Sequence, residues 1–408
     1  MKILDKKTTY KIYVTIICIS FLQGLQYAPS PVLRQISEHF PQVSTSLVQM
    51  LITGPSLVGM FCALMSGMLV TKISKKKLLL ISSLISGVSG ILPMFFDSFA
   101  LLFGCRLIYG FALGLATALN TAVVAEWFEG DARVKAMGIQ AASVGAGMAV
   151  TTAGAGYLGA RVFADSYYIN LIGFVCFVLI LIFLPETGRV VQTAENKIRI
   201  NARVVVIAIL GLLEFMFLIS FTTNISMHLT GGLAGNVAVS GNLTSIFSIA
   251  QIIIGLILAS ITRITKRATL PVAMFSFVLG AALLIGFSSN FAMLCVGAVL
   301  CGFSQGVFIP TAMVEEANAV PPAAAAMASG VFTCGTCTGQ ILSPIVLNTT
   351  AKLVFGEATT SGVYTVAAIG MALSTLLCAT VMFGKTKNSI DHKITKKNKK
   401  KQKGDYRS

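Results

Sequence analysis

Two charged residues stand inside long apolar runs of the sequence, Arg106 and Glu214. A charge inside a membrane is costly unless it is paired or hydrated, so such residues are functional candidates by default. Glu214 lies roughly 15 Å into its run at about 1.5 Å per helical residue, near the middle of a bilayer. A carboxyl at that depth could take up and release a proton or contact a substrate. The alternative is a structural pair between Glu214 and a hydroxyl or an Arg on a facing helix.

Arg106 lies nearer the outer end of its own run. Its guanidinium is permanently charged and can hold a carboxylate in a two-pronged pair. It could therefore bind an anionic substrate, or it could control the protonation of a nearby acid. A third possibility is that its long side chain extends to the outer membrane surface. The residue type alone does not choose between these roles.

Uncharged polar residues within the apolar runs form a second group of candidates. Such residues most often form hydrogen bonds between helices, and some of them contact ligands. Gln23 and Gln26 are three residues apart and share a helix face, with Tyr27 beside them. The candidates for contact with a substrate or coupling ion are Gln23, Gln26, Tyr27, Tyr109, Asn120, Asn224 and Gln305, with Gln251 and Gln340 of the same type. Glu126, Glu315 and Glu316 lie at inner ends of runs, where pairing with basic loops is expected.

Long apolar runs must position these side chains. The 408 residues are 55% hydrophobic and only 11% charged, whereas ordinary soluble domains carry about 25% charged residues. A membrane-spanning helix needs roughly 20 mostly apolar residues, and helices are the simplest way to satisfy the backbone in lipid. We expect twelve spans, at about 11–33, 45–70, 77–96, 98–123, 136–160, 167–184, 203–228, 240–262, 268–287, 290–313, 323–347 and 362–384. The longest outer connection is then Asn348–Gly362.

The formal charge of +16 is distributed unevenly. Of the 31 Lys and Arg residues, all but four fall in predicted inner segments, the exceptions being Arg34, Arg161, Lys352 and Arg106. This asymmetry predicts a multi-pass protein of the cell membrane with both termini in the cytoplasm. The Lys-rich tail is expected to contact anionic lipid headgroups or to remain solvated as a topology signal. The location of the charge argues against nucleic acid as a partner.

Two short patterns recur half a chain apart. Gly110-Phe111-x-x-Gly114 matches Gly302-Phe303-x-x-Gly306. A basic hexamer also occurs twice, as Thr71-Lys72-Ile73-Ser74-Lys75-Lys76 and as Thr262-Arg263-Ile264-Thr265-Lys266-Arg267. Such repeats predict two parallel six-helix halves with a substrate site between them. The expected division is a cytoplasmic N-terminus (1–10), an N-terminal bundle (11–184), a cytoplasmic linker (185–202), a C-terminal bundle (203–384) and a Lys-rich cytoplasmic tail (385–408).

The sequence carries no recognisable catalytic machinery. It contains no phosphate-binding G-x-x-x-x-G-K-[ST] loop, and its three histidines are scattered. All nine cysteines fall within predicted spans, so a disulfide framework is not expected. Cys334 and Cys337 have redox-motif spacing, but they stand in a Gly/Thr-rich helix, where packing is the ordinary use. We therefore expect a monomeric protein that is not an enzyme and needs neither cofactor nor metal.

The inner loop and the fourth span resemble the signatures of the major facilitator superfamily. The family's loop has the form G-x-x-x-D-R-x-G-R-K, and Gly67, Thr71, Lys72, Ser74, Lys75 and Lys76 occupy the corresponding positions. Thr71 replaces the acid, which in the family helps to hold the inner gate. Arg106, Gly110 and Gly114 resemble R-x-x-x-G-x-x-x-G, and Pro185-Glu186-Thr187 resembles the P-E-T mark. The resemblance implies an all-α integral membrane protein of twelve helices in two pseudo-symmetric bundles. It also implies a gating role for Gly67, Thr71, Lys72, Lys75 and Lys76.

The resemblance also implies a function, a secondary transporter that works by alternating access. The Arg-bearing fourth span looks like that of bacterial drug exporters. Drug:proton antiporters of the family, however, carry a G-P pair in the fifth span, which is rich in glycine here but has no proline between Gly147 and Gly156. The preferred hypothesis is proton-coupled export of a small amphiphilic or drug-like compound, with Glu214 as the proton site and Arg106 tuning it. The alternatives are proton-coupled uptake of a small organic anion held by Arg106, and a non-transporting membrane sensor.

Overall fold

The computed structural model describes residues 6–128, 130–186, 202–320 and 325–404, and only the backbone beyond residue 383. All regular elements of these residues are helical. The N-terminal half contains α1 (Lys6–Gly24), η1 (Leu25–Tyr27), η2 (Ser30–Val32), α2 (Leu33–His39), α3 (Thr45–Lys72), α4 (Lys75–Ile91), η3 (Leu92–Phe95), α5 (Phe99–Trp127), α6 (Gly130–Leu158), η4 (Phe163–Leu171) and α7 (Ile172–Phe183). The C-terminal half contains α8 (Ala202–Leu218), α9 (Ser220–His228), η5 (Gly231–Leu233), α10 (Val237–Thr265), η6 (Lys266–Ala268), α11 (Thr269–Gly286), α12 (Phe291–Ala317), α13 (Ala325–Phe355) and α14 (Thr360–Gly404).

Each of the twelve predicted spans corresponds to a helix or a broken helix. The first crossing is interrupted at η1 and η2, and the seventh consists of α8 and α9 in sequence. Within the described residues, ten segments are long and apolar enough to cross a membrane, and one of them, Val237–Gly286, covers both α10 and α11. The helix α6 is not among them, because its many Gly residues and its Thr pair lower its hydropathy.

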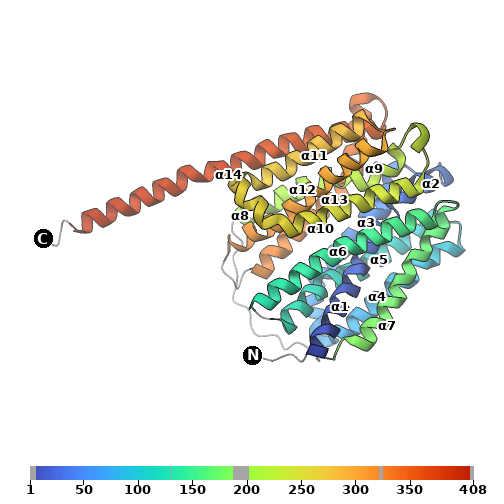
Figure 1. The fold of residues 1–408 in the computed structure, drawn as a ribbon, viewed down its shortest axis with the longest axis horizontal. Coiled ribbons are helices and arrows are strands. Elements are labelled where there is room, and N and C mark those ends of the chain that lie inside the picture. The colour runs from blue at the N-terminus through green and yellow to red at the C-terminus, as the bar shows by residue number, and fades with distance from the viewer. Residues whose placement is uncertain (1–5, 129, 187–201, 321–324, 405–408) are drawn as a thin grey trace.

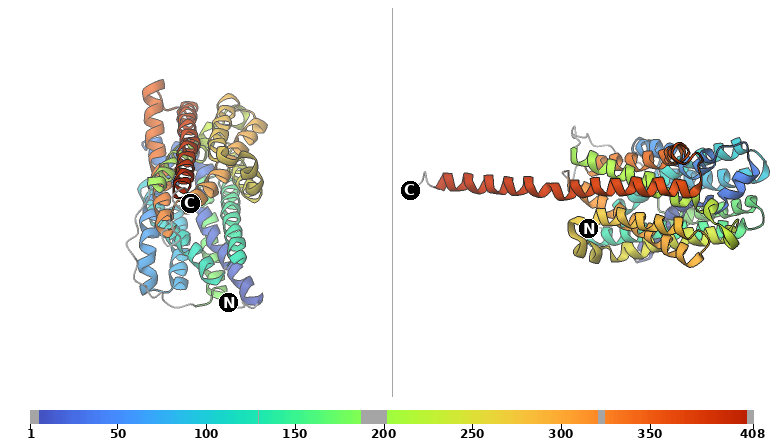
Figure 2. Two further views of the ribbon diagram at one scale, coloured as in Figure 1. Left: turned by 90° about the vertical axis from the view of Figure 1, so that its left-hand side faces the viewer. Right: turned by 90° about the horizontal axis from the view of Figure 1, so that it is seen from above.

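The two halves form adjacent bundles whose helices run roughly side by side (Figure 1). They contact each other where α3 packs on α13 and where α6 packs on α10. The start of α1 and the end of α14 lie at the same end of the bundle, from which α14 projects well beyond the other helices (Figure 2). Charge asymmetry predicts that this end faces the cytoplasm, so we call it the inner end and the opposite one the outer end.

Close helix contacts at glycine repeat in the two halves. A Cβ on Gly114 of α5 would stand 2.2 Å from the carbonyl oxygen of Gly59 in α3. A Cβ on Gly302 of α12 would stand 2.4 Å from the carbonyl oxygen of Phe247 in α10. Small residues allow such close approach of helices where the hydrophobic effect does not drive them together. The recurring G-F-x-x-G pattern therefore marks the same kind of contact in each half.

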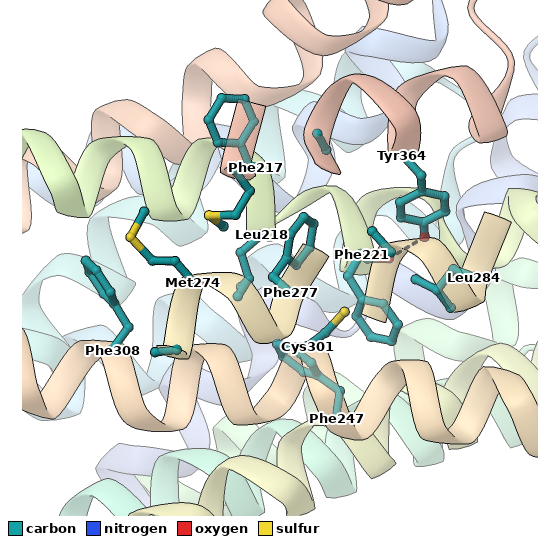
Figure 3. Close-up of a cluster of buried hydrophobic side chains, with 14 of the residues drawn as sticks. Phe217, Leu218, Phe221, Phe247, Met274, Phe277, Leu284, Cys301, Phe308 and Tyr364 are labelled. Carbon is teal, nitrogen blue, oxygen red and sulfur yellow. Dashed lines mark hydrogen bonds between the residues drawn. The ribbon is translucent and has the colours of Figure 1, made fainter. Parts of the chain in front are cut away.

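The core of the C-terminal half is a continuous apolar cluster contributed by all its long helices (Figure 3). Phe221 stacks on Phe247 with ring centroids 4.9 Å apart, which ties α9 to α10. The hydroxyl of Tyr364 on α14 donates a hydrogen bond to the carbonyl oxygen of Phe221. The N-terminal half is filled by two smaller clusters, one around Ile12–Leu25 and one around Val32–Phe40 at the outer end. These cores hold each half as a unit.

The predicted outer connection Asn348–Gly362 is wrong. The helix α13 continues to Phe355, so Asn348 lies within it and the connection to α14 is only 356–359. Thr and Lys residues end an apolar run without ending a helix, because neither removes a backbone hydrogen bond. In the Lys-rich tail the backbone of α14 remains helical to Gly404. Most of the predicted linker, residues 187–201, including Thr187 of the P-E-T mark, lies outside the described residues.

Candidate functional site

Arg106 joins three helices of the N-terminal half. It lies on α5 with only 6% of its surface exposed. Its Nε donates to the carbonyl oxygen of Leu51 in α3 at 2.7 Å, and its Nη2 donates to that of Gln26 at 2.5 Å. Its Nη1 donates to the carbonyl oxygen of Leu25 at 3.4 Å. The side chain is therefore buried among carbonyl oxygens and does not extend to the outer surface.

Proline explains why these carbonyl oxygens accept a side-chain donor. In an α-helix the carbonyl of residue i accepts from the N–H of residue i+4, and proline has no N–H. The residue four positions after Leu51 is Pro55, and the residue four positions after Leu25 is Pro29. Arg106 thus donates to two carbonyl groups that lack their i+4 donor, of which that of Leu25 also accepts from the Ala28 N–H at 3.3 Å. In lipid a carbonyl without a donor is expensive, so the hydrogen bond to Leu51 stabilises α3 at its internal proline, and the bond to Leu25 adds to the i+3 hydrogen bond of η1.

Tyr109 and Gln26, two of the predicted site residues, complete this cluster. The Arg106 guanidinium carbon lies 4.8 Å from the centre of the Tyr109 ring, within cation–π range. The Tyr109 hydroxyl donates to the carbonyl oxygen of Leu22 at 2.6 Å. Tyr27 packs against the apolar clusters of both halves. Gln23 differs from the others, because its Nε2 is buried without a hydrogen-bond partner among the described residues.

The side chain of Gln26 crosses to the other half. Its Nε2 donates to Oε1 of Gln340 on α13 at 3.1 Å and to the Ser56 hydroxyl at 2.8 Å. The Ser56 hydroxyl donates to the same Gln340 oxygen at 2.8 Å. Gln26 therefore links the arginine cluster, through its backbone, to the C-terminal half, through its side chain.

A second amide bridge lies closer to the outer end. Gln49 on α3 donates from Nε2 to Oδ1 of Asn224 on α9 at 2.7 Å. Its Oε1 accepts from Nδ2 of Asn348 on α13, also at 2.7 Å. A hydroxyl pair, Thr152 on α6 and Ser245 on α10, lies 3.1 Å apart at the other contact between the halves. We call these bridges together the outer gate, which consists of Gln26, Gln49, Ser56, Thr152, Asn224, Ser245, Gln340 and Asn348. Hydrogen bonds between side chains thus join the two halves toward the outer end of the molecule.

Glu214 lies away from Arg106, in the interior of the C-terminal half. The side chain on α8 is fully buried, and its Oε1 accepts from the Ser304 hydroxyl on α12 at 2.7 Å. Its Oε2 is buried without a partner among the described residues. The hydroxyl pairing considered from the sequence is therefore present, but it satisfies only one of the two carboxyl oxygens.

The remaining predicted polar residues also bond within one half. Gln305 on α12 accepts from Gln251 on α10 at 2.5 Å. Asn120 on α5 donates to the hydroxyl of Ser20 on α1 at 3.0 Å. The predicted set is therefore dispersed into an Arg106–Tyr109–Gln26 cluster, the Asn224 bridge and separate pairs at Glu214, Gln305 and Asn120.

The predicted gating residues lie mostly at helix ends. Gly67, Thr71 and Lys72 belong to α3, whereas Lys75 and Lys76 open α4. Ser74 caps α4, because its hydroxyl accepts from the Lys77 N–H at 3.4 Å. Lys75 forms an ion pair of 2.7 Å with Glu126 at the inner end of α5, as expected for that acid. Thr71, which stands where the family has an acid, donates to the Met68 carbonyl oxygen of its own helix.

Sequence reasoning missed several residues of the outer gate and one contact of Glu214. They are hydroxyl and amide side chains near the outer ends of spans, together with one serine in the tenth span: Ser56, Gln49, Asn348, Thr152, Ser245 and Ser304. Gln49 could have been found from the sequence, because it is a polar residue inside an apolar stretch. Single Ser and Thr residues gave no signal, because they commonly bond their own helix backbone.

A known protein family matches both halves of the chain. The sequence model of the Major Facilitator Superfamily matches residues 15–234 and 207–405, together nearly the whole chain. This chain belongs to the major facilitator superfamily. Its members are transporters, which agrees with the two helical halves and the hydrogen-bonded gate between them. No curated protein sequence matches the chain significantly.

Solved transporters share the superfamily fold at low sequence identity. The nucleoside transporter NupG (D323A mutant) is 16% identical with a TM-score of 0.74, over 91% of this chain and 100% of that one. The POT family transporter PepTSo is 10% identical with a TM-score of 0.74, over 91% and 97%. The human organic anion transporter MFSD10 (TETRAN) is 16% identical with a TM-score of 0.63, over 91% and 99%. At these identities the likeness establishes the fold alone.

Proposed function

We propose that this superfamily member exports a small neutral or cationic amphiphile in exchange for protons, as a monomer in the plasma membrane with both termini in the cytoplasm. The two halves rock about a site at mid-membrane depth, and the outer gate opens as the inner end closes. Glu214 is the proton site in this proposal. The assignment to the drug-exporter-like branch is part of the proposal.

The observation that carries the coupling assignment is the environment of Glu214. Its carboxyl is fully buried and has one oxygen without a hydrogen-bond partner among the described residues. A group held in this way can be protonated and deprotonated as water reaches it in one state and not in the other. The Ser304 hydroxyl, at 2.7 Å, couples the protonation of Glu214 to the position of α12 against α8.

The chemistry between the halves supports the substrate class. The outer gate is built from amides and hydroxyls, and Arg106 directs its Nε, Nη1 and Nη2 to backbone carbonyl oxygens. A carboxylate substrate would have to displace those hydrogen bonds, and the carbonyl groups would then lose their donor. A neutral or cationic solute needs no such displacement, so this class fits better than an organic anion.

The proposal can be tested by ligand binding followed by transport. The purified protein is screened for thermal stabilisation by lipophilic cations and by small carboxylates. A ligand present at 100 times its dissociation constant stabilises the folded state by about 2.7 kcal/mol. The best ligand is then followed in proteoliposomes with an imposed pH gradient, using wild type, Glu214→Gln and the control Glu38→Gln. Glu38 is an outer acid whose side chain is 62% exposed.

We expect Glu214→Gln to retain binding and downhill exchange and to lose accumulation driven by the pH gradient. Glu38→Gln is expected to behave as wild type. Normal pH-driven accumulation in Glu214→Gln would remove Glu214 as the proton site. Stabilisation by carboxylates alone would instead favour uptake of an organic anion.

A further inference from the structure

A cavity lies at the inner end of the C-terminal half, apart from the outer gate and from Glu214. Its volume is about 410 Å³, within the roughly 300–1,000 Å³ of small-molecule sites. It is bounded by the start of α8, by η6 and the start of α11, and by the inner parts of α12 and α14. The lining residues are Arg203, Lys266, Arg267, Thr269, Leu270, Thr311, Glu315 and Met382.

The two copies of the basic hexamer differ in how their lysines are paired, and the second copy lines this cavity. In the N-terminal half, Lys75 of the basic hexamer is neutralised by Glu126 at the inner end of α5. The corresponding residue of the second hexamer is Lys266, and it has no ion-pair partner among the described residues. The nearby acid, Glu315 at the inner end of α12, instead forms an ion pair with Arg203. Among the described residues that line the cavity, three side chains are basic and one, Glu315, is a carboxylate that is already paired with Arg203.

The backbone adds to this positive character. The helix α11 begins at Thr269, and its cap residue Ala268 supplies no side-chain acceptor to the first N–H groups. The helix dipole places partial positive charge at this end of α11, while Pro271 at its third position has no N–H to donate. Lys266 holds a positive φ of 51°, a conformation that costs a non-glycine residue energy and is often found at functional sites.

Thr311, in the wall of the same cavity, carries a polar atom without a partner among the described residues. Oγ1 of Thr311 on α12 is buried and has no hydrogen-bond partner among the described residues. Buried hydroxyl groups are normally satisfied, so an oxygen-rich ligand would complete this one. Leu270 and Met382, both buried, provide an apolar wall beside the charged groups. The cavity thus combines cations, a hydroxyl donor and a helix N-terminus with an apolar side.

We propose that this cavity binds a phosphate group, either the headgroup of an anionic phospholipid or a soluble phosphorylated compound. Lysine and arginine donate charge-assisted hydrogen bonds to phosphate oxygens, and the dipole of α11 adds positive potential at this end of the helix. Basic pockets between helices near the cytoplasmic membrane surface suit anionic headgroups, and the predicted orientation places this cavity there. The phosphate would connect η6 to α12 in the way that Glu126 connects the first hexamer to α5.

The test measures binding to the full-length protein in detergent. The probes are short-chain phosphatidic acid, inorganic phosphate and, as a zwitterionic control, short-chain phosphatidylcholine. Each is titrated while thermal unfolding is followed. The cavity variant is Lys266→Gln/Arg267→Gln. Its matched control is Lys76→Gln/Lys77→Gln, which removes two charges from the beginning of α4 at the same end of the other half.

We expect saturable stabilisation by at least one phosphate probe and none by phosphatidylcholine. The cavity variant should weaken binding at least tenfold, and the control variant should change it less than twofold. Saturation by phosphatidic acid alone identifies a headgroup site, and saturation by inorganic phosphate identifies a site for a soluble phosphate. Equal weakening in the two variants, or saturation by neither phosphate probe, would overturn the proposal.

Discussion

The Nε of Arg106 lies 2.7 Å from the carbonyl oxygen of Leu51, four residues before Pro55. The arginine thereby supplies the donor that the proline removes from α3. The same guanidinium also donates to Leu25, four residues before Pro29 in the first span. One side chain on α5 therefore binds both α3, at its internal proline, and the interrupted first span, at η1. Arg106, which stands in the family's signature, therefore donates side-chain hydrogen bonds to backbone carbonyl oxygens.

Loss of Arg106 should destabilise the N-terminal half. Replacement by Ala removes hydrogen bonds to three buried carbonyl groups, at about 1–3 kcal/mol each before relaxation. Replacement by Lys keeps the charge but cannot reach three acceptors in one plane, so it should rescue little. Both variants should melt well below wild type in detergent without ligand. Arg161→Ala, at an exposed outer position, should leave the melting temperature unchanged; equal melting of Arg106→Ala and wild type would contradict the assignment.

A proline replacement should partly rescue the arginine variant. In Pro55→Ala the restored N–H can donate to Leu51, so the carbonyl no longer depends on Arg106. We expect Pro55→Ala to stabilise the Arg106→Ala background by about 1 kcal/mol more than it stabilises wild type. Pro310→Ala, in α12 of the other half, should show no such coupling. The double-mutant cycle is measured by thermal unfolding, and additive effects of Pro55→Ala would refute the donor relationship.

The sequence predicts the fold of this chain much better than the contacts of its site. Long apolar runs and the recurring G-F-x-x-G pattern depend on local composition, and both are found in the structure as helices and close helix contacts. The partners of Arg106 could not be anticipated from charge, because backbone carbonyl acceptors have no side-chain signature. The positions of Pro29 and Pro55, counted four residues back, point to Leu25 and Leu51, and nothing in the sequence points to Gln26.

The partner of Glu214 also could not be predicted from the sequence. The burial of Glu214 within a long apolar span was expected from the sequence, whereas its partner could not be predicted. Ser304 is one of many serines in the spans, and which of them faces Glu214 depends on the rotation of α12 about its axis. The extension of α13 beyond Asn348 was missed because polar residues end an apolar run before they end a helix.

Glycines of the long helices should differ in their tolerance to replacement by Ala, according to the space around each Cα. Gly114→Ala and Gly302→Ala place a Cβ 2.2 Å and 2.4 Å from carbonyl oxygens of neighbouring helices, so both should lower stability and expression. Gly104 on α5 and Gly255 on α10 have nothing within 4 Å, so Ala there should be neutral or stabilising by up to about 1 kcal/mol. Thermal unfolding of the four variants checks this. A destabilised Gly104→Ala together with a tolerated Gly114→Ala would exclude the packing of α5 on α3 described above.

A disulfide across the outer gate should stop the transport cycle. Thr152 and Ser245 lie on different halves with their hydroxyl oxygens 3.1 Å apart, so a cysteine pair there can be oxidised with little movement. In a background lacking the nine native cysteines, oxidation of Thr152→Cys/Ser245→Cys should abolish transport, and a reductant should restore it. The matched pair Thr230→Cys/Ser288→Cys replaces hydroxyl groups 2.7 Å apart within the C-terminal half, so its disulfide should leave transport intact. Transport by the fully oxidised first pair would mean that α6 and α10 stay together throughout the cycle, and alternating access would then require a different gate.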